Sequence, residues 1–386
     1  MNLQELDKTY VAGTYRRFPV SIVSGRGSLV RDENGKEYID LGSGIAVNSF
    51  GVADGLWQKA VIDQIGKVQH MSNLYYTEPC ARLAQMLCER TGMKKVFFSN
   101  SGAEANECAI KAARKYAASI HGADCYTIIT LKNSFHGRTL TTLAATGQDY
   151  FHELFQPLTP GFVSAEAGNL DELKALAERY KTAAVMIECV QGEGGVVALE
   201  KTYVQALAEY VKEKDILLIV DEVQTGNGRT GQLYAYMNYG VTPDIVSTAK
   251  GLAGGLPLGA TLLGEKAQDT LGPGDHGSTF GGNPVSCAAA RSVLGRIDDA
   301  LLSEVREKSR YLFRTFEGAA GIEAVSGMGL MIGLKTTKPA GEVLAACMER
   351  GVLCLTAKDR VRLLPALNIP LELLERAAEI IKDCCK

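Results

Sequence analysis

The chain has 386 residues, of which 46% are hydrophobic and 22% are charged, and its formal net charge is −3. This length is sufficient for two domains with a large core, and the composition is ordinary for a globular protein. With an isoelectric point near 6.1, the sequence gives no electrostatic reason to expect nucleic acid or an anionic membrane as a partner.

No segment of the sequence is typical of a membrane span or a targeting signal. The apolar runs are much shorter than the ~20 residues that a spanning helix needs, and the opening segment MNLQELDKTY has acidic residues and no apolar stretch. We therefore expect a cytoplasmic protein. The ten cysteines lack the spacing of a zinc site, so we expect reduced thiols and no metal, with the state of Cys384 and Cys385 left open.

Residues 1–45 are predicted to form an N-terminal arm and a pair of strands that belongs to a small domain. In SLVRDENGKEYIDL, two strand-like runs flank Asn34 and Gly35, a dipeptide that is favoured in hairpin turns. The large domain is predicted to follow, over residues 46–284.

Within the large domain, strand-like runs alternate with helical segments. Apolar residues recur at helical spacing at Leu173, Leu176, Ala177 and Tyr180. This alternation predicts an α/β fold with a mainly parallel sheet that is covered by helices on both faces. The predicted strands are Val96–Phe98, Tyr126–Thr130, Ala184–Ile187, Ile216–Val220 and Ala260–Leu263.

Residues 285–386 are predicted to form one long connecting helix and the rest of the small domain. The helix is expected from about Val285 to Phe316. The segments AVSGMGLMIGLK, VLCLTA, VRLLPAL and ELLERAAEIIKDCC then predict short strands and a closing amphipathic helix. We expect this α+β domain to pack against the N-terminal arm.

Two residues that can carry chemistry follow predicted strand ends. Asp221 comes directly after the apolar run 216–220, and Lys250 follows a second short run at 245–246. Ligands of open parallel sheets collect at the carboxyl ends of strands, so these residues form a candidate site. A lysine that forms a Schiff base and a buried aspartate beside a pyridine nitrogen are the groups that pyridoxal phosphate needs. The alternative for each residue alone is a solvated surface position.

Small and hydroxyl residues supply a candidate phosphate site. VFFSNSGAEANE predicts a strand, a turn and a helix, and Ser101, Gly102 and Ala103 fall where helix N-terminal amides bind phosphate. The alternative is a helix cap with nothing bound. Ser278 and Thr279 lie in the glycine-rich segment HGSTFGGNP, where their hydroxyls can bind phosphate or substrate unless the segment is a plain connector.

An aromatic residue and three charged residues complete the candidates. In KNSFHGRT, Phe135 is suited to lie against a flat ring and Arg138 to bind a carboxylate, unless they are a core residue and a surface residue. Glu193 lies among glycines in QGEGGV. Arg362 stands in the otherwise apolar VRLLPAL, which indicates a carboxylate partner from the protein or from a ligand.

The segment GNGRTG fits the dinucleotide-binding pattern GxGxxG after a strand. That pattern requires a helix to open at the third glycine, and the following QLYAYMNYG has no capping signal. We therefore reject nicotinamide binding and expect a tightly bent loop near the ligand.

Taken together, six motifs occur in the order found in class III pyridoxal-phosphate-dependent aminotransferases of fold type I, which the chain resembles over nearly its whole length. The motifs are NSGAEANE, SFHGRT, QGEGGV, DEVQTGNGRTG, AKGLAGGLPLGA and HGSTFGGNP. The resemblance implies a homodimer with the active site at the subunit interface. It is strongest to the members that transfer the δ-amine of N2-acetyl-L-ornithine to 2-oxoglutarate in arginine biosynthesis, giving N-acetyl-L-glutamate 5-semialdehyde and L-glutamate. Ornithine, succinylornithine, succinyl-diaminopimelate and 4-aminobutyrate aminotransferases share these motifs and remain alternatives.

The resemblance also implies roles for individual residues. Lys250 would form the Schiff base and move the proton, Asp221 would contact the pyridine nitrogen, and Thr279 would reach the phosphate from the other subunit. Phe135 would stack on the ring, and Gln224 would approach the ring hydroxyl. The full set implied for the cofactor is Ser101, Gly102, Ala103, Phe135, Asp221, Glu222, Val223, Gln224, Lys250 and Thr279.

For the substrates, the resemblance implies that Arg138 holds a carboxylate with Ser278 close by. Glu193 would mask Arg362 while the δ-amine reacts, and would release it for the α-carboxylate of glutamate. Such a pair lets one pocket accept two substrates that present different amines.

The chain departs from the family pattern in one segment. Where the family usually has Gly-His-x-His-Pro after GIAVN, this chain has SFGVADG, with Val52, Asp54 and Gly55.

A cofactor-binding protein without catalysis is disfavoured because Lys250 and Asp221 are both present. An aminomutase would turn over without any oxo acid, which separates it from an aminotransferase.

Overall fold

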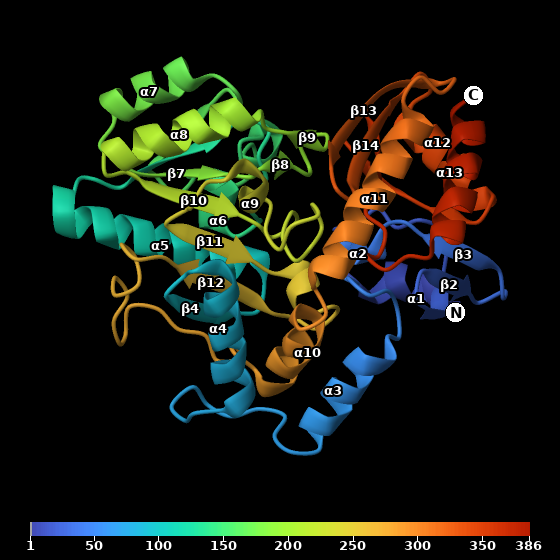
Figure 1. Cartoon of the computed structure of the whole chain (residues 1–386), viewed down its shortest axis with the longest axis horizontal. Coiled ribbons are helices and arrows are strands. Elements are labelled where there is room, and N and C mark those ends of the chain that lie inside the picture. The colour runs from blue at the N-terminus through green and yellow to red at the C-terminus, as the bar shows by residue number, and fades with distance from the viewer. Residues whose placement is uncertain (1) are drawn as a thin grey trace.

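A seven-stranded sheet forms the centre of the computed structural model, which describes residues 2–386 (Figure 1). In spatial order its strands are β4 (Lys95–Ser99), β12 (Gly259–Leu263), β11 (Ile245–Thr248), β10 (Leu217–Asp221), β7 (Thr182–Ile187), β5 (Thr127–Leu131) and β6 (Phe162–Ala165). β12 is antiparallel to β4 and β11, and the other neighbouring pairs are parallel. The five strands expected from the sequence are therefore confirmed, and the sheet is mainly parallel as predicted.

Helices cover both faces of this sheet, and the alternation of side chains along β10 shows why. Leu217 and Ile219 pack in a buried cluster with Ile110 of α5 (Gly102–His121), whereas Leu218 and Val220 belong to the cluster of α7 (Leu170–Arg179) and α8 (Lys201–Glu213). All five residues of β10 are buried, which explains their continuous apolar run. In Figure 1, α7 and α8 lie above β7 and β10.

The two ends of the chain meet in a second group of elements, on the right of Figure 1. The hairpin expected around Gly35 is confirmed, because β2 (Leu29–Asp32) pairs antiparallel with β3 (Glu37–Asp40) and Gly35 has a φ of 82°. β3 pairs in parallel with β15 (Val352–Leu353), and β1 (Ile22–Arg26) completes this sheet. The pairing supports the division into 1–45, 46–284 and 285–386, which we retain as a proposal.

A separate four-stranded sheet carries Arg362. Its strands, in spatial order, are β13 (Ile322–Met328), β14 (Met331–Thr336), β17 (Arg360–Leu363) and β16 (Leu355–Ala357). It packs with α12 (Ala340–Glu349) and α13 (Leu371–Cys385). The remaining elements are α1 (Leu3–Tyr10), α2 (Ser43–Ala46), α3 (Gly55–Ile65), α4 (Glu78–Thr91), α6 (Leu140–Ala145), α9 (Tyr236–Tyr239), β8 (Val190–Gln191), β9 (Val197–Ala198) and the 3₁₀ turns Asp149–Phe151 and Lys250–Leu252.

The single long helix expected from Val285 to Phe316 is wrong. The chain forms α10 (Pro284–Leu294) and α11 (Asp299–Phe316), with a break between them. Gly295 ends the first helix, and the Asp298 side chain accepts a hydrogen bond from the Leu301 amide at the start of the second. Glycine disfavours a helix interior and aspartate favours an N-cap, so the break has a local cause that apolar periodicity does not reveal.

The segment that departs from the family pattern has its own structural roles. The Asp54 carboxylate caps α3 by accepting from the Trp57 amide at 2.9 Å, and it pairs with Arg296 at 2.8 Å. Val52 forms an isolated antiparallel bridge with Gly27. The departure therefore links the start of α3 to Arg296 after α10, and the segment before α3 to Gly27, the residue after β1.

Two further observations concern the chain as a whole. Across residues 2–386 we find no helix that is both long and apolar enough to cross a membrane. The ten cysteines in this range are unbridged, and Cys384 and Cys385 are buried on α13. The question that the sequence left open at the C-terminus is therefore answered by two packed, free thiols.

Candidate active site

A cavity of about 580 Å³ opens at the carboxyl ends of β10 and β11. Asp221 is the last residue of β10, and Lys250 follows the end of β11 by two positions. Both line the cavity, because neighbouring parallel strands end at the same edge of a sheet. The predicted residues that line it are Ser101, Gly102, Ala103, Phe135, Arg138, Asp221, Val223, Gln224 and Lys250.

Lys250 is held at the cavity by an uncommon backbone conformation. Its φ is 46°, in the left-handed region that a lysine rarely adopts, and it opens a short 3₁₀ turn. Burial lowers the pKa of its amine, while the carboxylate of Asp221 opposes that shift. A lysine amine whose neutral form is favoured by burial is suited to attack a carbonyl carbon and to accept a proton.

The carboxylate of Asp221 is buried and fixed by three donors. Its Oδ2 accepts from Asn106 Nδ2 at 2.7 Å and from His136 Nδ1 at 2.8 Å, and its Oδ1 accepts from the Val223 amide at 3.0 Å. Asp221 as a whole is 3% exposed. A negative charge held at this depth is a suitable partner for a cationic ring nitrogen.

Another part of the cavity is formed by the N-terminus of α5. Ser101 is the helix cap: its Oγ accepts from the Glu104 amide at 3.2 Å and donates to the Glu104 carboxylate, also at 3.2 Å. The capping alternative is therefore realised for this hydroxyl. The amides of Gly102 and Ala103 occupy the first turn, where no intrahelical partner exists, and they remain available to an anion. A Cβ on Gly102 would lie 2.6 Å from Val223 Cγ1.

Phe135 and Arg138 line a third part of the cavity. The Phe135 amide donates to Glu188 Oε2 at 2.9 Å, which fixes the backbone beneath the ring. The guanidinium carbon of Arg138 lies 5.8 Å from the centre of the Phe135 ring and 5.2 Å from that of Phe151. Arg138 is exposed and has no ion-pair partner among residues 2–386, so it is available to a carboxylate that enters the cavity.

The pair predicted between Glu193 and Arg362 is present. Arg362 Nη1 donates to Glu193 Oε1 at 2.6 Å, and the arginine, on β17, is 3% exposed. Gln224 contacts both partners and also lines the cavity. Gln224 therefore lies between the ion pair and the cavity that Lys250 and Asp221 line.

Five predicted residues do not line this cavity: the pair Glu193 and Arg362, and also Glu222, Ser278 and Thr279. Glu222 is fully buried, and its carboxylate accepts from Thr225 Oγ1 at 2.6 Å and from the Tyr236 amide at 2.8 Å. Ser278 Oγ accepts from Asn100 Nδ2 at 3.1 Å and from the Gly281 amide at 2.9 Å, so it supports the loop beside the site. Thr279 is exposed and lies outside the lining.

Replacing Glu222 with glutamine is expected to leave cofactor affinity within about twofold of the wild type and to change the pH dependence of stability. Burial raises the pKa of Glu222 to about 7 from 4.5. The folded chain therefore binds this proton more tightly than the unfolded chain, and the free energy of unfolding falls as the pH rises from 4.5 to 7, by about 1.4 kcal/mol per pH unit. Glutamine accepts from Tyr236 and donates to Thr225, so urea unfolding between pH 5 and 8 should lose this decline. Cofactor affinity lowered tenfold would contradict the placement.

Four residues of the site were not singled out in the sequence. His136 and Asn106 hold Asp221, Glu188 holds the Phe135 backbone, and Tyr15 lines the cavity from the N-terminal arm. Burial raises the pKa of Glu188 to about 7. His136 directly follows Phe135 within SFHGRT, and Asn106 lies one helical turn after Gly102, so helical spacing is a signal for Asn106.

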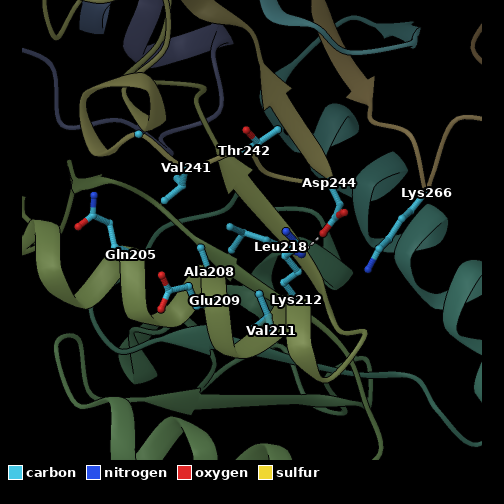
Figure 2. A pocket seen from close by; sticks show the side chains of 11 residues that line it. Gln205, Ala208, Glu209, Val211, Lys212, Leu218, Val241, Thr242, Asp244 and Lys266 are labelled. Atoms are coloured by element: carbon cyan, nitrogen blue, oxygen red, sulfur yellow. Dashed lines mark hydrogen bonds between the residues drawn. The ribbon is translucent and has the colours of Figure 1, made fainter.

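A second cavity, of about 540 Å³, lies at the opposite edge of the sheet (Figure 2). It is formed by α8, the start of β10 and the segment before β11. In Figure 2 the Asp244 side chain points toward Leu218, whose amide donates to Asp244 Oδ2 at 2.9 Å. Lys266 lines it too and pairs with Asp215 at 2.6 Å. This cavity lies at the amino ends of the strands, away from Asp221 and Lys250.

The donor set of the first cavity fits pyridoxal phosphate. Two helix amides can take the phosphate, the Asp221 carboxylate can take the ring nitrogen, and the Lys250 amine lies in the same lining for the aldehyde. The ring of Phe135 offers an apolar surface for the aromatic ring. One cavity thus contains partners for the phosphate, for the ring nitrogen and for the aldehyde of the cofactor.

Comparisons with known proteins agree with this chemistry. A family model described as aminotransferase class-III matches residues 10–385. The chain is 50% identical to the acetylornithine aminotransferase of Haemophilus ducreyi, over 98% of this chain and 97% of the relative. It is 42% identical to that of Clostridium acetobutylicum, over 99% of this chain and 100% of the relative.

Solved structures show the same fold. An N-acetylornithine aminotransferase from Stenotrophomonas maltophilia has a TM-score of 0.86 and 34% identity, covering 99% of this chain and 98% of that chain. An ornithine aminotransferase from Toxoplasma gondii has a TM-score of 0.95 and 31% identity, covering 99% and 94%. The predicted fold type I architecture is confirmed. With its site geometry and near-complete match, this chain belongs to the pyridoxal-phosphate-dependent class III aminotransferases.

Proposed function

We propose that this aminotransferase moves the δ-amine of N2-acetyl-L-ornithine to 2-oxoglutarate, giving N-acetyl-L-glutamate 5-semialdehyde and L-glutamate, as a step of arginine biosynthesis. The observation that carries the proposal is the Glu193–Arg362 pair, 2.6 Å between its atoms, beside the cavity of Lys250 and Asp221. The names of the relatives from Haemophilus ducreyi and Stenotrophomonas maltophilia support the same donor.

The two substrates differ in the number of carboxylates that they present. Acetylornithine reacts at the far end of its side chain, so one carboxylate enters the site, and the exposed Arg138 is placed to bind it. 2-Oxoglutarate presents two carboxylates. Arg362 is neutralised by Glu193 in the first half-reaction and is needed by the second carboxylate in the next, which requires Glu193 to turn away.

The chain's own residues carry the proton and the charge. When bound, pyridoxal phosphate withdraws electrons from the carbon that bears the reacting amine. Lys250 Nζ would remove the proton from that carbon and deliver it to the former aldehyde carbon of the cofactor, because its neutral amine is favoured by burial. Asp221 maintains a negative charge at the ring nitrogen, and the donors Asn106 and His136 keep its carboxylate in one orientation.

We include in the proposal a cytoplasmic homodimer with the active site at the subunit interface. Thr279 is exposed and outside its own cavity, which suits a contact to the phosphate in the other subunit. The segment SNLYYTEP supports association through apolar side chains: Leu74 is 89% exposed and Tyr75 is 67% exposed. Patches of this kind often mark contacts between proteins.

The donor is tested by mixing the purified protein separately with N2-acetylornithine, N2-succinylornithine, ornithine and 4-aminobutyrate in a single turnover. We expect the acylated donors to convert the visible absorption band of the bound cofactor at least ~10-fold faster than free ornithine, since an uncompensated second amine must be desolvated in the site. Faster conversion with ornithine or 4-aminobutyrate would assign the protein to that sister activity. Product formed over many turnovers in the absence of 2-oxoglutarate would indicate an aminomutase.

A further inference from the structure

Gln224 bridges the two members of the ion pair. Its Oε1 accepts from Arg362 Nη1 at 3.2 Å, and its Nε2 donates to Glu193 Oε1 at 3.4 Å. Arg362 Nη1 also donates directly to Glu193 Oε1 at 2.6 Å, so the three side chains form one hydrogen-bonded network. Gln224 is 6% exposed and is the member of this network that also lines the cavity. It therefore touches the pair and the cofactor space at the same time.

The position of this carboxamide depends on a neighbouring glycine. A Cβ on Gly192 would lie 2.4 Å from Gln224 Oε1 and 2.7 Å from its Cδ, which no side chain tolerates without movement. The carbonyl of Gly192 also lies 3.4 Å from Arg362 Nη1. The chain thus leaves a space into which the Gln224 carboxamide fits.

The guanidinium of Arg362 is incompletely paired in this arrangement. All of its contacts with Glu193, Gln224 and Gly192 run through Nη1. Its Nε is buried and has no hydrogen-bond partner among residues 2–386. A buried unpaired donor is unfavourable, and a planar guanidinium binds a carboxylate best through two nitrogens, so Arg362 is prepared to take a further carboxylate.

We propose that Gln224 holds Arg362 in place when Glu193 turns away, and so acts as a positioning residue for the second carboxylate of dicarboxylate substrates. The hydrogen bond from Arg362 to Gln224 Oε1 does not involve Glu193, so it survives the loss of the ion pair. This inference rests on the proposed function, in which the donor brings one carboxylate and the acceptor brings two.

The hydrogen-bonding capacity of the carboxamide allows this role alongside contact with the cofactor. A glutamine side chain has two N–H donors and one oxygen with two lone pairs. Glu193 takes one N–H group and Arg362 donates to the oxygen. The second N–H group remains for the ring hydroxyl of the cofactor, the contact that the resemblance to the family implies for this residue.

The test is a binding measurement on the protein with pyridoxal phosphate bound, using two compounds that cannot react. Glutarate carries two carboxylates, and N-acetyl-L-norvaline carries the acyl group and single carboxylate of the donor without its δ-amine. In Gln224→Met, which keeps the volume and removes the amide, calorimetry should show the glutarate Kd raised about tenfold and the N-acetylnorvaline Kd within twofold. Gly192→Ala should reproduce the split, because its Cβ displaces the carboxamide.

A matched control is Gln205→Ala, which removes a partly buried glutamine that donates to the Tyr239 carbonyl at the other edge of the sheet. It should change neither Kd. Equal changes for both compounds in Gln224→Met, or no change, would overturn the positioning role. If the wild type binds glutarate but not N-acetylnorvaline, the acylated donor is wrong, and that result is distinct from a missing split in the variant.

Discussion

Lys250→Ala is expected to lower turnover by at least ~10⁴-fold. It should also abolish the visible absorption band that arises when the cofactor is bound covalently to the protein. The side chain supplies both the amine that binds the cofactor aldehyde and the base that moves the substrate proton. Among the described residues that line the cavity, Lys250 is the one lysine, so no second primary amine can replace it. Loss of Lys250 therefore removes two functions at once.

The position of this lysine also explains why its loss should not unfold the protein. Alanine at this site keeps the backbone of the short turn after β11, although the φ of 46° remains unfavourable for any residue with a Cβ. The buried amine is a destabilising group in the folded state, since burial lowers its pKa. We therefore expect the free energy of unfolding of Lys250→Ala to be equal to or above that of the wild type.

The measurement is the absorption spectrum together with single-turnover kinetics in the presence and absence of methylamine. A small amine that enters the cavity should restore part of the proton transfer in Lys250→Ala, with a rate that rises with the concentration of its neutral form. Lys250→Arg serves as the matched variant, because it keeps the charge but cannot act as a base near neutral pH. Turnover of either variant within tenfold of the wild type would contradict the assignment.

The parts of the site that could be predicted are those that secondary structure alone positions. Asp221 and Lys250 were predicted to lie together because each follows a buried strand, and parallel strands end at one edge. Gly102 and Ala103 were predicted as anion ligands because a helix begins there. For these residues, local sequence determines the strand or helix end, and the sheet geometry does the rest.

Other features depend on packing that no local pattern encodes. Glu222 is adjacent to Asp221, yet successive residues at a strand end face opposite ways, and Glu222 is directed to Thr225 and Tyr236. The Gln224 bridge arises from the approach of β17, more than a hundred residues away along the chain, toward the segment that contains Gly192. Apolar periodicity also continued across Gly295, although the helix stops there.

Asp221→Asn is expected to lower kcat by about 10³-fold, the second largest effect at this site. Asparagine has nearly the same shape, and an oxygen in the place of Oδ2 can still accept from Asn106 and His136. It lacks the negative charge that keeps a proton on the ring nitrogen, and its Nδ2 takes the place of Oδ1, so the hydrogen bond from the Val223 amide is lost as well. The expected loss is mainly electrostatic and appears in kcat more than in the affinity for the donor.

The charge can be separated from packing by two measurements and one control. The ¹⁵N chemical shift of labelled cofactor should report a protonated ring nitrogen in the wild type and a neutral one in Asp221→Asn. Asp244→Asn is the matched control. The Asp244 carboxylate also accepts a hydrogen bond from a backbone amide, that of Leu218 at 2.9 Å, but it lies at the amino end of β11, away from the site. This variant should leave kcat and the ¹⁵N shift unchanged. If Asp221→Asn kept a protonated ring nitrogen, the charge would have to come from another group, and Glu188, whose pKa is raised to about 7 by burial, is the other carboxyl group among the residues that line this cavity.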